Sequence, residues 1–178
     1  VAAELYHLWV IEGPETLAAR LPFREIGLNI IWTADQRKYR ERKVRILNGA
    51  HTTGIPVSYQ YGLDTVKEMM DNPVTGSFVR QAIYQEILPA LADSDREALD
   101  NLAAEVINRF NNPYIKHYLL SILLNSSSKY RARVLPSLLD YQQKYQKLPQ
   151  RLVFALSCLL NVYSLGEIVA GKLTCKRD

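Results

Sequence analysis

The pattern of apolar and polar positions changes character about a fifth of the way along the chain. Residues 4–11 are rich in aromatic and β-branched side chains and predict a strand, and residues 28–32 predict a second one. From residue 36 onward, apolar side chains recur at helical spacing almost to the end. The pattern predicts a mainly α domain over residues 36–178, preceded by a segment with short strands over residues 1–35.

Capping residues and prolines predict where the helices begin. Asp35 can cap a helix that runs to about His51, and Gly54 and Pro56 predict a bend or a restart beyond it. A polar run at residues 125–128 predicts a break between later helices. Further helix starts are predicted at Asp64, at Asn72-Pro73, at the capping-box pair Ser94 and Glu97, at Asn112-Pro113, at Tyr130 and at Pro149.

Composition limits the class of protein. The chain has 178 residues, enough for one domain with a core, and a formal net charge of +4. Its two cysteines, Cys158 and Cys175, lie at no metal or redox spacing, which favours a reducing cytoplasmic location. No apolar run of about 18 residues is present, so no membrane span is expected. The three histidines lack metal-ligand spacing, so no metal is expected either.

The most distinctive candidate chemistry lies in the first predicted helix. Lys43, Asn48 and His51 fall at roughly 0°, 140° and 80° around an ideal helix, so they share one side of it. An amine, an amide and an imidazole in one space suit proton transfer to or from a hydroxyl or carbonyl oxygen. Arg40, three residues before Lys43, would favour the neutral form of that amine.

A structural explanation accounts for the same residues. A basic helix is usually a solvated face, and on residue types alone this is the commoner arrangement. It leaves open a second function class, a basic helical module that binds nucleic acid, whose affinity would fall steeply as salt rises. The chain contains no recognised nucleic-acid-binding motif, which argues against that class.

Residues 42–51 resemble the signature of the long-chain mannitol dehydrogenase family, with Lys, Asn and His at the same spacing. Residues 7–12, 27–33 and 109–117 carry further family elements, and Asn-Pro-Tyr-Ile-Lys-His at 112–117 resembles the tagaturonate-reducing branch. The resemblance implies the helical, 6-phosphogluconate-dehydrogenase C-terminal-like domain of a two-domain enzyme. In this family an N-terminal Rossmann domain, which this chain lacks, binds NAD.

The same resemblance implies roles for individual residues. Lys43 would be the general acid/base, while Asn48 and His51 would bind and polarise the reacting oxygen. Lys129 matches a family lysine that contacts the substrate further along its chain. Lys116 and His117 are also candidate substrate-binding residues, although an exposed helix start would account for them equally well.

Three departures from the polyol-oxidising members concern the substrate. This chain has Arg40 in place of a Glu, Ser121 in place of an Arg, and Asn-Ser-Ser at 125–127 in place of Asp-Gly-Ser. These departures argue against mannitol, and the hypothesis is that Arg40 accommodates a uronate carboxylate. The implied activity is NAD-dependent reduction of tagaturonate to altronate, with fructuronate reduction or polyol oxidation as alternatives.

No glycine-rich phosphate loop follows a predicted strand anywhere in the chain. The chain alone therefore cannot supply a dinucleotide site, and the fragment by itself is expected to be inactive. As a fragment cut at a domain junction, it is also expected to expose apolar surface near residues 1–35. Its expected partners are a sugar acid and its own N-terminal domain, not a membrane or nucleic acid.

Overall fold

The computed structural model describes residues 8–21, 25–92, 95–169 and 172–174. The chain divides into two compact units, residues 1–42 and residues 43–178. Each unit has its own fold.

The first unit contains a parallel pair of short strands. Its elements in chain order are β1 (Trp9–Glu12), the 3₁₀ helix η1 (Glu15–Arg20), β2 (Ile30–Thr33) and α1 (Arg37–Arg42). Trp9 pairs with Ile30 and Glu12 with Thr33, so both predicted strands are confirmed, each shifted slightly toward the C-terminus. Residues 4–7 of the first predicted strand lie outside the described residues.

Several large apolar side chains of this unit are exposed, as the sequence predicts for residues 1–35. They are Leu8, Trp9, Leu17, Leu21, Ile26 and Leu28. A polar contact orders the start of α1, because the Glu12 carboxylate accepts the Gln36 backbone N–H at 3.0 Å. Asp35 accepts the Arg37 backbone N–H at 2.9 Å, which confirms the predicted cap.

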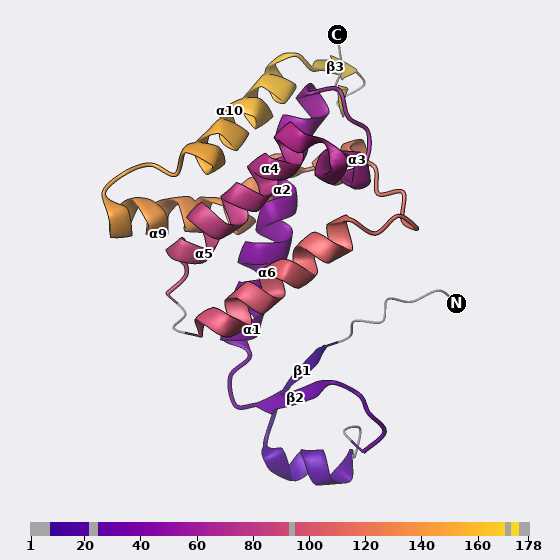
Figure 1. Ribbon diagram of the computed structural model, residues 1–178, viewed down its shortest axis with the longest axis vertical. Coiled ribbons are helices and arrows are strands. Elements are labelled where there is room, and N and C mark those ends of the chain that lie inside the picture. Colours follow the sequence, from indigo (N-terminus) through magenta and orange to yellow (C-terminus); the bar gives the residue numbers. More distant parts are fainter. Residues whose placement is uncertain (1–7, 22–24, 93–94, 170–171, 175–178) are drawn as a thin grey trace. The chain divides into compact units, whose positions relative to one another are not determined.

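The second unit is helical apart from a hairpin at its end (Figure 1). The hairpin, β3 (Glu167–Val169) with β4 (Lys172–Thr174), is antiparallel and was not predicted. The helices η2 and η3 are π-helical and the others are α-helices. In chain order they are η2 (Lys43–Asn48), α2 (Gly49–Gln60), α3 (Val66–Asp71), α4 (Pro73–Ala82), η3 (Ile83–Ile87), α5 (Leu88–Ala90), α6 (Arg96–Phe110), α7 (Leu119–Leu123), α8 (Ser126–Arg133), α9 (Leu135–Tyr145) and α10 (Gln150–Ser164).

Helix α2 is the centre of this unit and packs against α4, α7, α8 and α10. Most of its residues are buried, on every side, as expected of a helix enclosed by others. A Cβ at Gly54 would lie 2.6 Å from the side chain of Val79, so the glycine permits α4 to approach closely. The predicted restart is wrong, because α2 continues through Gly54 and Pro56 to Gln60.

Some predicted helix starts are confirmed and others move by a residue. Asn72 caps α4 through the N–H groups of Val74 and Thr75, as expected. The cap of α3 is Thr65, in a capping box with Glu68, instead of Asp64. Helix α6 is capped by Asp95, while the predicted cap Ser94 lies outside the described residues.

The helix predicted from Asn112-Pro113 does not form there. Residues 113–118 are non-helical, and α7 begins only at Leu119. The reason is a long-range pairing, in which the Leu119 N–H donates to the Asp64 carbonyl at 2.8 Å and the Val66 N–H donates to the His117 carbonyl at 3.0 Å. This pairing holds the segment extended and fixes His117 and its neighbour Tyr118.

Among the later helix boundaries, too, some agree with the prediction and others differ from it. The predicted break at residues 125–128 is confined to Asn125, which adopts the left-handed conformation, and Ser126 already begins α8. The helix predicted from Tyr130 is two helices that meet at Val134. Helix α10 begins directly after Pro149, as predicted.

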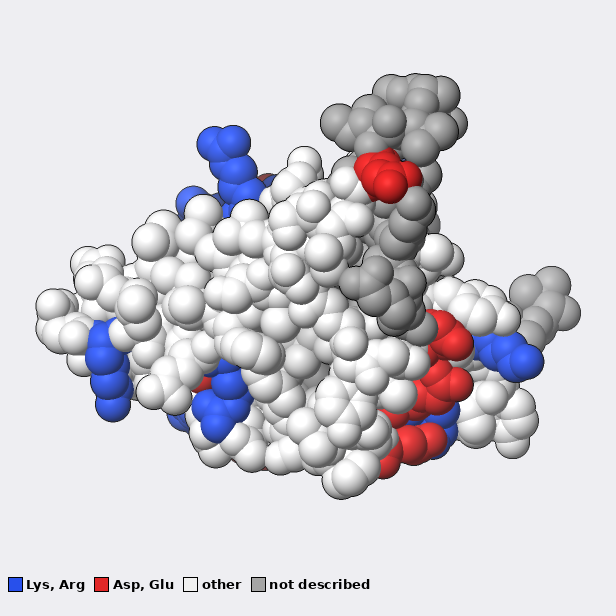
Figure 2. Space-filling model, turned by 90° about the horizontal axis from the view of Figure 1, so that it is seen from above, with Lys and Arg blue, Asp and Glu red and all other residues white. Residues whose placement is uncertain are grey.

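Figure 2 looks onto the end of the second unit where α10 lies, and most of that surface carries no charged side chain. Exposed apolar side chains on α9 and α10 include Leu139, Phe154 and Leu160. Among the described residues no helix is both long and apolar enough to cross a membrane.

Candidate active site

A π-helical turn carries the first two candidate residues. In a π-helix the hydrogen bonds join residues five apart, so Asn48 follows Lys43 by one full turn of η2. His51 lies three residues further on in α2, just under one α-helical turn. The separation of roughly 140° expected for Asn48 on an ideal α-helix is therefore wrong. The three residues lie closer to one line along the helix than the sequence predicts.

The trio differs in burial. Lys43 is exposed and Asn48 is half-buried. Within the part of the chain that the structure describes, the side chains of Lys43 and Asn48 have neither a hydrogen bond nor an ion pair. Both functional groups are thus available to a ligand.

His51 is half-buried, like Asn48, and its imidazole packs against two other rings. Its ring centroid lies 4.0 Å from that of Phe110, at the end of α6, and 5.4 Å from that of His117. Its Nδ1 atom is buried and has no hydrogen-bond partner among the described residues. A buried polar atom without a partner costs free energy, so this atom is a candidate for contact with a ligand or water.

Burial, and to a smaller extent nearby basic groups, together lower the pKa of His51 from 6.5 to about 3. Those bases are His117, Arg133, Arg109 and Lys129, in decreasing order of effect. The imidazole is therefore neutral at physiological pH, with one nitrogen as a donor and the other as an acceptor. The neutral imidazole can orient a substrate oxygen by hydrogen bonding, but it is not suited to act as the general acid.

Helix α8 brings two of these cations to the site. Lys129 and Arg133 are four residues apart and so lie on one face of the helix. A Cβ at Gly49 would lie 3.1 Å from the Arg133 carbonyl oxygen, so the glycine after Asn48 lets α8 approach closely. The Lys129 ammonium donates to the Ile122 carbonyl at 2.6 Å. Burial and the charge of Arg133 both lower the pKa of Lys129.

Sequence reasoning placed Lys129 and His117 among the candidates, and the structure brings both to His51. Sequence reasoning missed Arg109 and Arg133. Two signals were present, since Arg133 is four residues after Lys129 and Arg109 lies within the family element at residues 109–117. Neither signal shows that the two arginines approach His51.

The two other candidates, Lys116 and Arg40, are exposed. Lys116 is exposed, in the non-helical segment before α7. Arg40 is exposed and belongs to the first unit. The basic stretch is also not a uniformly solvated face, because Arg45 is 5% exposed and its guanidinium pairs with Asp140 at 2.6 Å.

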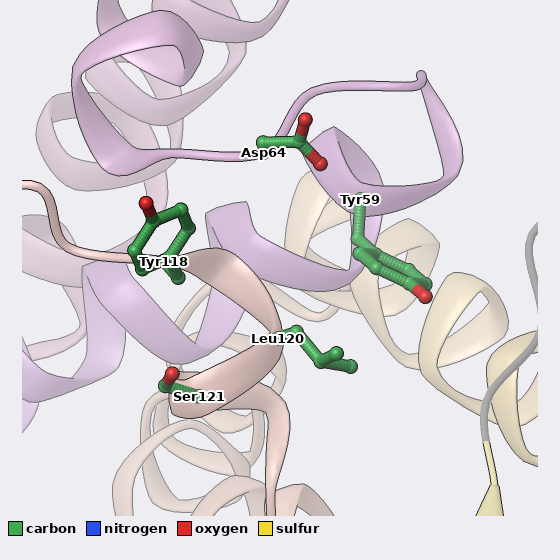
Figure 3. A pocket seen from close by; sticks show the side chains of 5 residues that line it. All are labelled: Tyr59, Asp64, Tyr118, Leu120 and Ser121. Atoms are coloured by element: carbon green, nitrogen blue, oxygen red, sulfur yellow. The ribbon is translucent and has the colours of Figure 1, made fainter.

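An open cavity of about 400 Å³ lies between the end of α2 and the start of α7 (Figure 3). Successive side chains of an extended segment point to opposite sides. Tyr118 accordingly lines this cavity, while the neighbouring His117 reaches His51. Ser121, where polyol-oxidising members carry an Arg, also lines it. The remaining lining residues are Tyr59, Asp64 and Leu120.

Comparison with known proteins shows the family of the chain. The family model described as "Mannitol dehydrogenase C-terminal domain" matches residues 35–173. The chain belongs to the mannitol dehydrogenase family. It is 50% identical over 167 residues to the altronate oxidoreductase of Bacillus subtilis (strain 168). The aligned region covers 94% of this chain and 34% of the Bacillus protein. The altronate oxidoreductase of Enterobacter sp. (strain 638) is 51% identical over 161 residues, covering 90% and 33%.

The mannitol dehydrogenase fold extends to more distant members. The Pseudomonas fluorescens mannitol 2-dehydrogenase, solved as a ternary complex with NAD and D-mannitol, superimposes with a TM-score of 0.67 at 22% identity. The superposition covers 75% of the present chain and 27% of the mannitol 2-dehydrogenase chain. A substrate-free D-sorbitol dehydrogenase gives a TM-score of 0.70 at 18% identity, covering 79% and 28%. The chain therefore spans about a third of the length of its curated relatives.

The described residues do not fit a dinucleotide site. β1 and β2 are parallel, but a 3₁₀ helix connects them and no glycine-rich phosphate loop follows β1. No group of three or more His, Cys, Asp or Glu side chains in the described ranges is placed to hold a metal ion.

We expect the imidazole of His51 to stay uncharged well below neutral pH. Its NMR C–H signals, identified by their loss in His51→Gln, should titrate with a midpoint below about pH 4, because burial opposes the charged form. A midpoint near 6.5 would contradict the enclosed site.

The same shift affects stability. Between pH 3 and 6.5 the unfolded chain binds a proton that folded His51 does not, so the unfolding free energy should fall as the pH drops through this window. The contribution is complete above pH 6.5, and His51→Gln should lack it.

Proposed function

We propose that this chain is the catalytic and substrate-binding domain of a cytoplasmic NAD-dependent oxidoreductase that interconverts D-tagaturonate and D-altronate. The observation that carries the proposal is the alignment of Lys43, Asn48 and His51 along nearly two turns of helix, beside a group of cations. The family membership and the relatives named altronate oxidoreductase support it.

Each residue has a defined task in this proposal. In the direction of reduction, protonated Lys43 gives a proton to the carbonyl oxygen as that oxygen gains negative charge. Asn48 donates a hydrogen bond from its amide to the same oxygen and so stabilises the charge. Neutral His51 donates a second hydrogen bond or holds the adjacent hydroxyl. In the reverse direction, neutral Lys43 removes the hydroxyl proton.

The proposal assigns the hydride carrier, NAD, to an N-terminal Rossmann domain outside this chain. That domain would also cover Lys43, which is exposed here. The isolated chain would accordingly show no turnover.

Other sugar-binding candidates keep the roles that the resemblance implies. Lys129 and His117 contact the substrate beyond the reacting carbon, and their place beside His51 supports this. Lys116 and Arg40 remain candidate contacts with the acid sugar. The alternative of a basic nucleic-acid-binding module is disfavoured, since Arg45 is buried and paired and the relatives are oxidoreductases.

The test is an NADH-oxidation assay of the full-length protein that contains this chain. Tagaturonate, fructuronate and fructose are compared as substrates. A clear preference for tagaturonate supports the proposal. Preference for fructuronate would place the protein in the mannonate-forming branch, and turnover of none of the three would refute an oxidoreductase of this class.

A further inference from the structure

Two cations of helix α8, Arg133 and Lys129, have no carboxylate partner within the described residues. Arg133 is half-buried, and in the described parts of the chain its guanidinium makes neither an ion pair nor a hydrogen bond. Its neighbour Lys129 is also half-buried, and that ammonium is bonded to a neutral carbonyl oxygen, not to a carboxylate. Two cations one helical turn apart repel each other unless an anion lies between them.

These cations lie near a buried polar atom that has no hydrogen-bond partner within the described residues. The buried Nδ1 of His51 has no partner among the described residues, and the groups that shift this imidazole are all bases. Arg109, at the end of α6, and His117, on the extended segment before α7, approach the same ring from other elements. Residues from α2, α6, α8 and this segment thus converge on one small positive region.

We propose that Arg133, with Lys129 beside it, binds the terminal carboxylate of the acid sugar, while His51 lies between this carboxylate subsite and Lys43. This inference rests on the function proposed above. A keto uronate carries its carboxylate at the end of the carbon chain, several atoms from its carbonyl. A guanidinium binds such a carboxylate in a bidentate manner, which fixes the substrate's direction as well as its charge.

The assignment differs from the hypothesis that Arg40 receives the carboxylate. Arg40 is exposed in the first unit, whereas Arg133 belongs to the same unit as His51 and Lys129. The half-burial of Arg133 also matters, because an ion pair shielded from water is stronger than an exposed one. Arg133 is therefore placed to discriminate an acid sugar from a neutral ketose.

The experiment compares Arg133→Gln with Arg131→Gln in the full-length protein. Arg131 is the matched control, an exposed arginine on the same helix α8. KM and kcat are measured for tagaturonate and for fructose, and altronate binding is measured by calorimetry. We expect Arg133→Gln to raise KM for tagaturonate about 10- to 100-fold with little change in kcat, the size expected when one charge-assisted pair is lost.

Three further results complete the test. In Arg133→Gln the loss of kcat/KM should be at least tenfold larger for tagaturonate than for fructose, circular dichroism should show that the variant folds, and Arg131→Gln should behave as the wild type. Arg133→Lys should recover part of the altronate affinity. Equal losses for the acid and the neutral sugar would overturn the carboxylate role, because they would indicate a structural role for Arg133.

The wild type separates the two proposals. A wild-type protein that does not prefer tagaturonate to fructose refutes the proposed function itself. A wild type that does prefer it, with Arg133→Gln indistinguishable from wild type, refutes only this inference. In that case a raised KM in Arg40→Gln would assign the carboxylate to Arg40.

Discussion

Replacing Lys43 with alanine in the full-length protein should lower kcat for tagaturonate reduction by roughly 10²- to 10⁴-fold, the usual contribution of a general acid. The substrate should still bind, since Asn48, His51 and the cations of α8 remain. The loss should therefore appear in kcat much more than in KM. Steady-state NADH oxidation measures both.

Lys38→Ala is the control for this variant. Lys38 is an exposed lysine of α1, five residues earlier, whose ammonium lies 5.0 Å from the ring centroid of Tyr39. Its loss should leave kcat unchanged. A small primary amine added to Lys43→Ala should restore part of the rate by supplying the missing proton donor. A loss below tenfold without amine rescue would show that another group transfers the proton.

The second large effect concerns stability. Glu86, in the π-helical turn η3, is 3% exposed, and its carboxylate caps the start of α10. It accepts the backbone N–H of Arg151 at 3.0 Å and that of Leu152 at 3.0 Å, and its Oε1 lies 3.1 Å from the Arg151 guanidinium. Glu86→Ala removes all of these bonds and leaves two buried donors without an acceptor.

We expect Glu86→Ala to lower the free energy of unfolding by about 3 kcal/mol, the lower end of the range for breaking a buried pair, since Arg151 is partly exposed. Urea denaturation followed by circular dichroism measures the loss. Glu86→Gln keeps one acceptor and should lose less. Glu97→Ala, an exposed acid of α6, should change stability by under about 0.5 kcal/mol. Equal effects of the two alanine variants would contradict the capping role.

The sequence predicted the parts of the fold that depend on neighbouring residues. Asn72-Pro73 and Pro149 mark helix starts through local hydrogen bonding and a fixed φ, so both were found. The start at Asn112-Pro113 failed because the pairing of Thr65 with Tyr118 holds that segment extended, and such a pairing leaves no local pattern. Pro56 did not break α2, because burial on all sides supports that helix.

The candidate site likewise has features that the sequence predicts locally and features that depend on the packing of distant segments. The spacing of Lys43, Asn48 and His51 is a local property, and the family signature made it visible. The π-helical turn was not predicted, because an apolar pattern does not reveal whether hydrogen bonds join residues four or five apart. The approach of Arg133 to His51 depends on the packing of α8 against α2, which no single segment encodes.

The π-helical turn also limits how this trio can be transferred to another scaffold. Each residue of an α-helix turns by about 100°, so the five-residue step from Lys43 to Asn48 would overshoot one turn by about 140° on an ordinary helix. A designer who grafts the three side chains at their native spacing onto a straight α-helix would splay the amide away from the amine. The graft needs the extra residue of η2, or a four-residue spacing in its place.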